Sequence, residues 1–331
     1  MGGVAYVFPG QGAQYVGMGV DLAEAFPRAR ALFQRASSVL GFDLLELCRS
    51  GPEETLQRTE NTQPAILVTS LACLEAARGR IPPPVVAAGL SLGEYTALVC
   101  AGSLEFEDAV WLVRQRGLFM QQATEGRETA MAAVLGLPAE AVEGVCQQAS
   151  ALGVCEASNY NAPDQVVVGG DRAAVEEAVR LAKAAGARRA VLLAVSAPFH
   201  TRLMRPAAER LREALDRVAL RDAELPVVAN VTAQPVQRAA DIRRLLVEQV
   251  ASPVRWAQSV AYMVQDGVDT FVELGPGTVL SGLVKRCARG ATTWHVEDRA
   301  SLEKTAAALG GGSLSPATGE TGARESSGAR T

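Results

Sequence analysis

The segment Val85–Leu98 predicts a buried strand, a sharp turn and a helix, and the turn has the form Gly89-x-Ser91-x-Gly93. Glycines on both sides let the backbone bend tightly, so that the serine hydroxyl stands exposed above a sheet. The following helix directs its N–H groups and its positive dipole end at the serine, and the Leu92 N–H is the natural donor to an oxyanion. The pattern favours a nucleophilic serine on an α/β sheet. The alternative is a chance match in an Ala/Gly-rich chain.

Composition supports a well-filled core of helices packed on a parallel sheet. Of the 331 residues, 48% are hydrophobic and only 5% are aromatic. Ala, Val and Leu therefore supply most of the apolar volume, which suits that architecture. The net charge of −4 argues weakly against nucleic acid as a partner. No segment has the uninterrupted apolar length of a membrane span, so we expect no membrane association.

The amino terminus and the cysteines bear on the cellular compartment. Met1–Tyr6 enters a strand almost at once and has no basic region, so we expect no signal peptide. The six cysteines are scattered, without the spacing of a metal site. We therefore expect reduced thiols, no bound metal and a cytoplasmic protein. The cysteines are Cys48, Cys73, Cys100, Cys146, Cys155 and Cys287.

A second structural unit is expected within residues 128–196. Its predicted order is strand, helix, strand, strand, helix, strand, which is typical of a ferredoxin-like fold. Residues 159–164 are expected to form a turn with two asparagines between the middle strands. The main unit would then be discontinuous, formed by residues 1–127 and 197–300. Residues 310–331 are almost free of apolar side chains and are expected to be disordered.

A serine nucleophile needs a base that is neutral near pH 7, and histidine is the side chain suited to that role. The chain has two histidines. His295 lies in an apolar, strand-like run and is interpreted as structural, whereas His200 follows a strand and a proline in a connection back to the main unit. The order serine, then histidine is that of G-x-S-x-G enzymes. No compelling acid completes a triad, because Asp164 and Asp171 look like turn and helix-cap residues.

Two further polar residues are candidates for the site. Gln11 follows the first predicted strand, at the end where open α/β sheets place ligand groups, although an exposed glutamine in a turn is the simpler interpretation. Arg116 is followed by Gly117, which would remove bulk beside the guanidinium and hints at an arginine in a pocket. Arg114, on the same predicted helix, is expected to lie on a solvated face.

Seven short motifs occur together and in order, and as a set they closely resemble those of the malonyl-CoA:acyl-carrier-protein transacylases of fatty acid and polyketide synthesis. The resemblance covers about residues 4–300. Each motif is weak alone, but the set in register is very specific. The motifs are Val7-Phe8-Pro9-Gly10-Gln11-Gly12-Ala13-Gln14, Thr62-Gln63-Pro64-Ala65, Gly89-Leu90-Ser91-Leu92-Gly93-Glu94-Tyr95, Arg116-Gly117, Asn159-Tyr160-Asn161-Ala162-Pro163, Pro198-Phe199-His200 and Glu273-Leu274-Gly275-Pro276-Gly277.

This resemblance implies an α/β-hydrolase-like large domain with an inserted ferredoxin-like subdomain and an active site between them. It implies that Ser91 is the nucleophile and His200 its base. In place of a triad carboxylate, a backbone carbonyl that matches Gln249 would hold the histidine. Gln11 and the Leu92 N–H would form the oxyanion hole, with either the backbone or the side chain of Gln11 as donor.

The resemblance also assigns the acyl pocket. Arg116 would pair with the malonyl carboxylate in a two-point contact. Phe199, just before the histidine, agrees with malonyl-selective members. Leu90 departs from the pattern, because many relatives have a histidine there, although leucine occurs in some discrete enzymes. Three further residues would line the site with less defined roles: Gln63, Asn159 and Asn161.

The implied reaction is ping-pong transfer of a malonyl group from malonyl-CoA to the phosphopantetheine thiol of an acyl carrier protein, through a malonyl-serine. No cofactor is implied, a monomer is expected, and the pathway could be fatty acid or polyketide synthesis. Basic residues near the mouth would dock an acidic carrier, with Arg202, Lys285 and Arg286 as candidates. A serine esterase or thioesterase that edits carrier proteins is the first alternative, but it has no use for Arg116. A non-catalytic docking subunit is the second, and the intact motifs argue against it.

Overall fold

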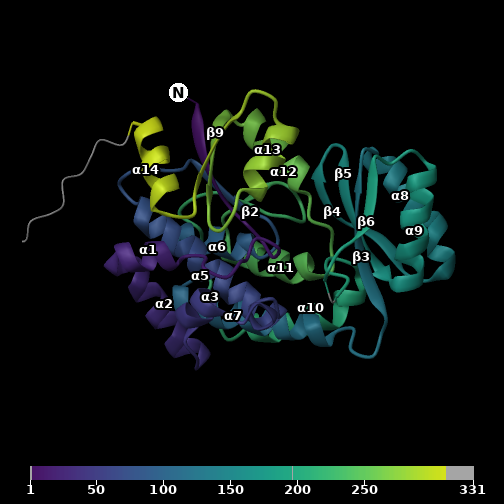
Figure 1. Cartoon of the computed structure of the whole chain (residues 1–331), viewed down its shortest axis with the longest axis horizontal. Coiled ribbons are helices and arrows are strands. Elements are labelled where there is room, and N and C mark those ends of the chain that lie inside the picture. The colour runs from purple at the N-terminus through teal and green to yellow at the C-terminus, as the bar shows by residue number, and fades with distance from the viewer. Residues whose placement is uncertain (1, 196, 311–331) are drawn as a thin grey trace, which may run out of the picture.

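The computed structural model describes residues 2–195 and 197–310, and its strands form two sheets (Figure 1). The larger sheet has the order β10-β9-β1-β2-β7-β8, and every neighbouring pair is parallel except β7 with β8. This confirms the predicted α/β class. The strands are β1 (Gly3–Phe8), β2 (Val86–Gly89), β7 (Val227–Val228), β8 (Pro235–Val236), β9 (Val268–Leu274) and β10 (Thr292–Val296).

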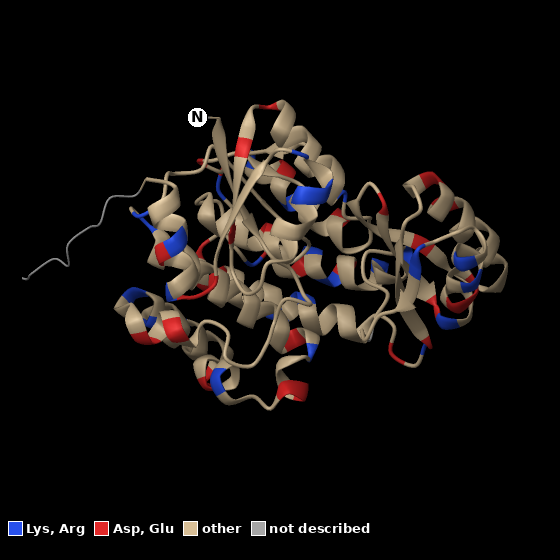
Figure 2. Cartoon of the chain, turned by 45° about the horizontal axis from the view of Figure 1, so that its top comes forward, with Lys and Arg blue, Asp and Glu red and all other residues tan. Residues whose placement is uncertain are grey.

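Helices cover both faces of this sheet, which explains why its central strands β1 and β2 are apolar. In β1, Ala5 and Val7 point into one core with Trp256, whereas Tyr6 and Phe8 point into the other. Figure 2 shows that the charged residues fall mainly on the outer helices and loops. The helices are α1 (Val20–Ala25), α2 (Pro27–Leu40), α3 (Leu44–Ser50), α4 (Glu53–Leu56), α5 (Thr59–Ala77), α6 (Gly93–Cys100), α7 (Phe106–Gln122), α10 (Arg205–Leu215), α11 (Ala239–Val250), α12 (Trp256–Gln265), α13 (Val279–Cys287) and α14 (Arg299–Ala308).

The smaller sheet is antiparallel, with the order β4-β5-β3-β6. Its chain order, strand-helix-strand-strand-helix-strand, is the predicted ferredoxin-like one. Figure 1 shows it beside the larger sheet, with α8 and α9 on its outer side. The elements are β3 (Thr129–Leu135), α8 (Ala139–Ala149), β4 (Cys155–Ala162), β5 (Gln165–Asp171), α9 (Arg172–Ala184) and β6 (Arg189–Leu192), with 3-10 turns at Ser150–Leu152 and Arg202–Met204.

The predicted turn at residues 159–164 is wrong, because β4 continues to Ala162. Irregularities in the β4–β5 register let polar residues stay in the strand. The outer edge of β4 also has a second partner in the chain after α11. The Val254 N–H donates to Ser158 O at 2.9 Å, and the Tyr160 N–H donates to Val254 O at 2.8 Å. These bonds tie the smaller sheet to the end of α11.

Two further expectations concern membrane-spanning helices and the predicted disordered segment at residues 310–331. Over residues 2–195 and 197–310, no helix combines the length and the apolar character needed to cross a membrane. The segment predicted to be disordered, residues 310–331, lies outside the described residues except for residue 310.

Candidate active site

Ser91 stands at the turn between β2 and α6, with a positive φ of 54°. Two glycines make this turn possible by close packing: a Cβ on Gly89 would lie 1.9 Å from the Gly93 carbonyl carbon, and one on Gly93 would lie 2.0 Å from Phe8 O. Asn230 clamps the turn from outside. Its Oδ1 accepts the Ser91 N–H at 2.6 Å, and its Nδ2 donates to Gly89 O at 2.7 Å.

His200 lies directly against the serine, with 2.6 Å between its Nε2 and Ser91 Oγ. Its Nδ1 is 2.7 Å from Gln249 O at the end of α11. A carbonyl can only accept, so Nδ1 carries the proton and Nε2 is left to accept from the serine hydroxyl. Burial, together with the nearby charge of Arg116, lowers the pKa of His200 to about 3. The imidazole is therefore neutral at physiological pH.

Arg116, on α7, points into the same site and is only 2% exposed. Its Nη2 donates to Ser91 Oγ at 3.0 Å and to Gln249 Oε1 at 2.9 Å, and its Nη1 donates to Gln63 Oε1 at 2.9 Å. A guanidinium held by neutral amides keeps its charge available for an anionic ligand. The guanidinium also lies 5.3 Å from the centre of the Tyr95 ring.

Two interpretations of the α7 sequence need correction. Gly117 faces α5 rather than the guanidinium, because a Cβ there would lie 2.7 Å from Glu60 Cα. The glycine thus lets α7 approach α5, which carries Gln63 toward Arg116. Arg114 is not on a solvated face: it is half-buried and donates to Asn61 Oδ1 at 2.8 Å.

Two backbone N–H groups beside Ser91 have no acceptor in the described part of the chain. They belong to Leu92, at the start of α6, and to Gln11, in the turn after β1. The Gln11 side chain is held separately, with Nε2 3.4 Å from Thr59 Oγ1. Unpaired N–H groups that point at a nucleophile, such as that of Leu92 at the start of a helix, can donate to an oxyanion.

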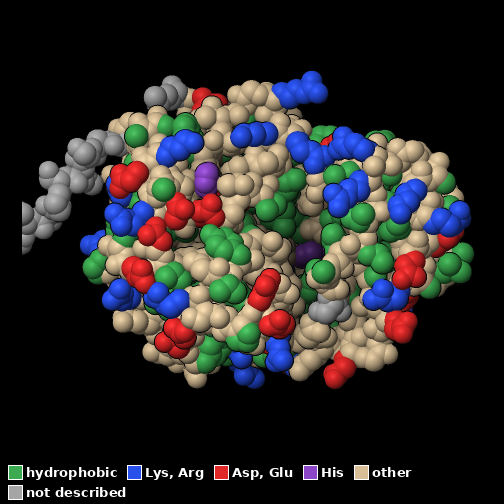
Figure 3. Space-filling model, viewed as in Figure 1, with side chains coloured by type: hydrophobic (Ala, Val, Ile, Leu, Met, Phe, Trp, Pro, Cys, Tyr) green, Lys and Arg blue, Asp and Glu red, His purple; other side chains and the backbone are tan. Residues whose placement is uncertain are grey.

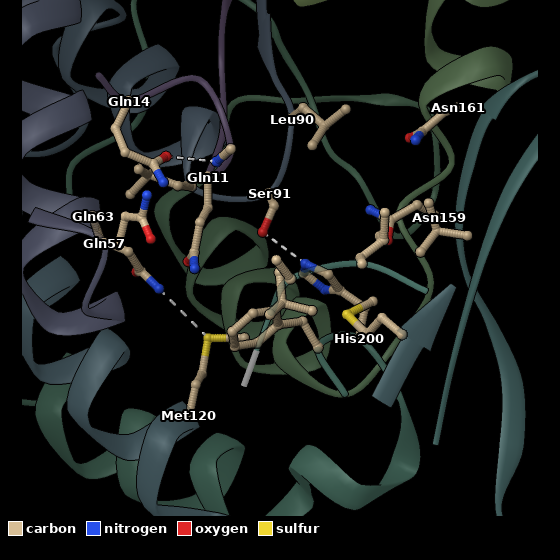
Figure 4. Close-up of a pocket in the computed structure, with 18 of the residues that line it drawn as sticks. Gln11, Gln14, Gln57, Gln63, Leu90, Ser91, Met120, Asn159, Asn161 and His200 are labelled. Atoms are coloured by element: carbon tan, nitrogen blue, oxygen red, sulfur yellow. Dashed lines mark hydrogen bonds between the residues drawn. The ribbon is translucent and has the colours of Figure 1, made fainter. Parts of the chain in front are cut away.

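A cavity of about 710 Å³ opens onto these groups and is lined by Ser91, Arg116 and His200. In Figure 3 it is a hollow between the two parts of the molecule, with a histidine at its floor. Figure 4 shows the Gln11 and Gln63 side chains on one side of the serine. The other lining residues predicted from the sequence are Leu90, Leu92, Asn159, Asn161 and Phe199.

These lining residues lie on different sides of the cavity. Asn159 faces the histidine side of the cavity from β4, and Figure 4 places Asn161 beyond it. Met120, Met131 and Val167 form an apolar wall. The site thus combines a polar end around the serine with an apolar side.

Sequence reasoning missed two buried residues behind the serine. Asn230 follows β7, so its place after a parallel strand was an available signal. Glu94 lies within the elbow motif, is only 3% exposed and accepts from the Asn230 N–H at 3.0 Å. Neither Asp164 nor Asp171 contacts the histidine; Asp171 pairs with Arg127 instead.

Fold and site together define a serine-dependent acyl-transfer enzyme. Residues 5–307 match the acyl transferase domain family. A malonyl CoA-acyl carrier protein transacylase of Bacillus subtilis is 47% identical over 304 residues, which are 92% of this chain and 96% of that protein. The chain therefore belongs to the malonyl CoA-acyl carrier protein transacylase family.

Solved structures agree with this assignment. The malonyl CoA-acyl carrier protein transacylase of Coxiella burnetii has a TM-score of 0.90 at 39% identity, over 93% of this chain and 98% of that one. A malonyl-transacylase solved with its type II polyketide synthase acyl-carrier protein also has a TM-score of 0.90, at 43% identity over 92% and 99% of the two chains. The fold class is thus that of the family.

Proposed function

We propose that this enzyme moves a malonyl group from malonyl-CoA to the phosphopantetheine thiol of an acyl carrier protein through a malonyl ester of Ser91. The observation that carries the proposal is the double contact of Ser91 Oγ, 2.6 Å from His200 Nε2 and 3.0 Å from Arg116 Nη2. A base and an anchor for an acidic acyl group therefore meet at one nucleophile. The relatives' names support the same substrates.

In the first half-reaction, His200 takes the proton of the Ser91 hydroxyl as Oγ attacks the thioester carbon. The backbone N–H groups of Leu92 and Gln11 would stabilise the oxyanion. As the tetrahedral intermediate collapses, the C–S bond breaks and the imidazolium returns its proton to the departing CoA thiolate. The Gln249 carbonyl keeps the ring in the tautomer that this sequence requires.

In the second half-reaction, the carrier's phosphopantetheine thiol gives its proton to His200 and attacks the malonyl ester. The Ser91 Oγ–C bond breaks, and Oγ recovers the proton from the imidazolium. Throughout, Arg116 would hold the malonyl carboxylate in a two-point contact. Gln63 and Asn159 would complete the polar lining around the acyl group, and Phe199 would limit its size.

The proposal extends to the oligomeric state, partner, cofactor and compartment of the enzyme. We propose a monomer that binds an acyl carrier protein, needs no cofactor and works in the cytoplasm. The six cysteines are free, as in proteins of reducing compartments. We also propose two units, one formed by residues 128–196 and one by residues 1–127 and 197–300. The smaller unit has an apolar core of its own, which supports this division, although Met131, Ala133 and Val167 pack into the core of the larger unit. The packing of α14 on β10 extends the larger unit past residue 300.

Labelled malonyl-CoA tests this function. We expect a covalent malonyl-enzyme that passes its label to holo acyl carrier protein, and no covalent product with Ser91→Ala. His200→Ala should lower kcat/KM by about 10²- to 10⁴-fold, the range for loss of a general base. Intact-mass measurement and a carrier-transfer assay provide the readouts. Rapid release of free malonate instead of transfer would establish a hydrolase.

A further inference from the structure

A buried carboxylate lies directly behind the acyl pocket and has no part in the reaction steps. Glu94 Oε2 accepts from Gln249 Nε2 at 2.8 Å and from the Asn230 N–H at 3.0 Å. The same Gln249 amide accepts from Arg116 through its Oε1 at 2.9 Å. One amide therefore bridges the carboxylate to the guanidinium.

Glu94 is the one described carboxylate whose charge acts on Arg116. Arg116 forms no ion pair with any described Asp or Glu, and its hydrogen bonds go to Gln63, Gln249 and Ser91. Gln249 therefore lies between the buried guanidinium and this carboxylate and is hydrogen-bonded to both.

Of the other titratable groups around Glu94, Tyr95 and His200 are neutral at physiological pH and Arg116 is charged. On its own helix, Tyr95 has a pKa that burial raises to about 12. From the loop before α10, His200 has a pKa that burial lowers to about 3. Arg116, from α7, is the charged neighbour. Burial raises the pKa of Glu94 to about 7, against the hydrogen bonds from Gln249 and Asn230 and the attraction of Arg116.

We propose that Glu94 is the counter-charge of Arg116 in the empty enzyme and takes up a proton from solvent when the malonyl carboxylate pairs with Arg116. The inference rests on the proposed function. Before loading, the buried site holds one cation and one anion. The malonyl carboxylate adds a second anion, and a low-dielectric interior disfavours that excess charge. Both hydrogen bonds to Glu94 end on Oε2, so a proton on Oε1 leaves them in place.

Transfer of the malonyl group to the carrier reverses the change, because the second anion leaves and Glu94 returns its proton to solvent. The proton balance of acyl transfer itself is unaffected, since the hydroxyl proton of Ser91 leaves on the CoA thiol. Linkage then requires malonyl binding to weaken as pH rises above the pKa of Glu94 in the empty enzyme. The expected rise in KM for malonyl-CoA approaches tenfold per pH unit.

The test has two measurements. Intact mass gives the fraction of enzyme that carries a malonyl group. A pH-indicator dye in weak buffer measures the protons taken up during that single loading turnover. Stoichiometric malonyl-CoA should load the wild-type enzyme and take up about one proton per malonyl-enzyme above pH 7, with less uptake below it. Infrared difference spectra should gain a band of a protonated carboxyl group. Acetyl-CoA, which carries no carboxylate, should produce neither signal in whatever fraction it loads.

Two variants assign the proton. Glu94→Gln can still accept from Gln249 and Asn230, so it should form the malonyl-enzyme without proton uptake, without the infrared band and with a KM that is flat across this pH range. Glu273→Gln is the matched control. Glu273 is also buried with a pKa raised to about 7, but it accepts from the N–H groups of Leu280 and Ser281 at the start of α13. Its replacement should leave the uptake intact.

Each remaining outcome is decisive. A malonyl-enzyme that forms without proton uptake at any pH overturns the inference and leaves the proposed function standing. Uptake that persists in Glu94→Gln assigns the proton elsewhere and also overturns it. Failure to form a malonyl-enzyme rejects the proposed function. If Glu94→Gln does not fold, the wild-type comparison of malonyl-CoA with acetyl-CoA still decides the question.

Discussion

The two reacting residues share an uncommon backbone conformation. Among the described non-glycine residues, only Ser91, His200 and Ala233 have positive φ, at 54°, 62° and 53°. Such conformations cost of order 1–3 kcal/mol each and persist only where the surroundings enforce them. At Ser91 the enforcement comes from Asn230, and at His200 from the Gln249 carbonyl. The rest of the fold therefore stabilises a strained reactive pair.

The charge of Arg116 should decide which acyl group is transferred. Arg116→Ala removes the cation that faces the malonyl carboxylate, so we expect kcat/KM for malonyl-CoA to fall by about 30- to 5,000-fold, the effect of losing one partner of a buried charge pair. Tolerance for acetyl-CoA should rise. Competition assays with both thioesters measure the change. An unchanged malonyl preference would mean that another residue anchors the carboxylate.

The buried histidine makes folding sensitive to acid. Below its ordinary pKa of about 6.5, His200 binds a proton in the unfolded chain, whereas the folded protein keeps it neutral down to about pH 3. The unfolded state thus binds more protons over this window, and the free energy of unfolding falls as pH is lowered.

His200→Gln should remove that contribution, which is about 1.4 kcal/mol per pH unit for one proton. Denaturant titrations at pH 7.5 and 5 measure it as the extra loss of stability in the wild type. Because Glu94 and Glu273 have raised pKa values, they act in the opposite direction in both proteins and cancel in the comparison. Equal losses in the two proteins would contradict the assignment.

At the scale of elements, the sequence predicted best what depends on neighbours along the chain. The β2-turn-α6 elbow and the six elements of the smaller sheet follow from local patterns of glycines and apolar residues. The contacts of Gln249 with Ser91 cross 158 residues, so only the family resemblance pointed to Gln249. Asn230 and Glu94 were missed for the same reason. Their roles depend on hydrogen bonds between distant segments, which leave no periodic signal.

The elbow needs glycine at position 93 because a Cβ there would clash with β1, and not because glycine makes the backbone flexible. Two substitutions separate these causes. Gly93→Ala would place a Cβ 2.0 Å from Phe8 O and force α6 away from β1. We expect a loss of about 1–3 kcal/mol or more, with reduced activity. Gly144→Ala, inside α8 with nothing within 4 Å of the added Cβ, should instead stabilise by about 0.4–1 kcal/mol. Thermal unfolding of both variants provides the comparison, and similar shifts would refute the steric explanation.

At the scale of the whole molecule, the cavity lies between the two sheets, and Figure 3 shows Lys and Arg side chains on the surface above the hollow and acidic side chains below it. The three basic candidates for carrier docking differ in whether they form ion pairs with acidic residues of this chain. Arg202 pairs with Glu156 and Arg286 with Asp164. Lys285 is exposed, forms no ion pair with a described residue and lines a separate hollow with His295 and Lys304. Its charge is therefore the one most available to an acidic partner.

Lys285→Glu should accordingly raise KM for the carrier protein by about 3- to 10-fold and weaken its salt dependence. Transfer to free pantetheine, which needs no docking surface, should not change. Lys183→Glu, on α9 at the outer side of the smaller sheet (Figure 1), is the matched control. Steady-state kinetics with both acceptors measure the effect. An equal response to the two substitutions would place docking elsewhere.

The order in which the chain supplies the site has a consequence for its synthesis. Ser91 precedes His200 by 109 residues and the Gln249 side chain that contacts it by 158. At ribosomal rates, roughly 8–32 s separate the emergence of the serine from that of Gln249. During that interval the nascent elbow has neither its base in place nor its counter-charge bridge. The enzyme therefore cannot capture acyl groups until the inserted ferredoxin-like unit has been made and the chain has returned to the larger sheet.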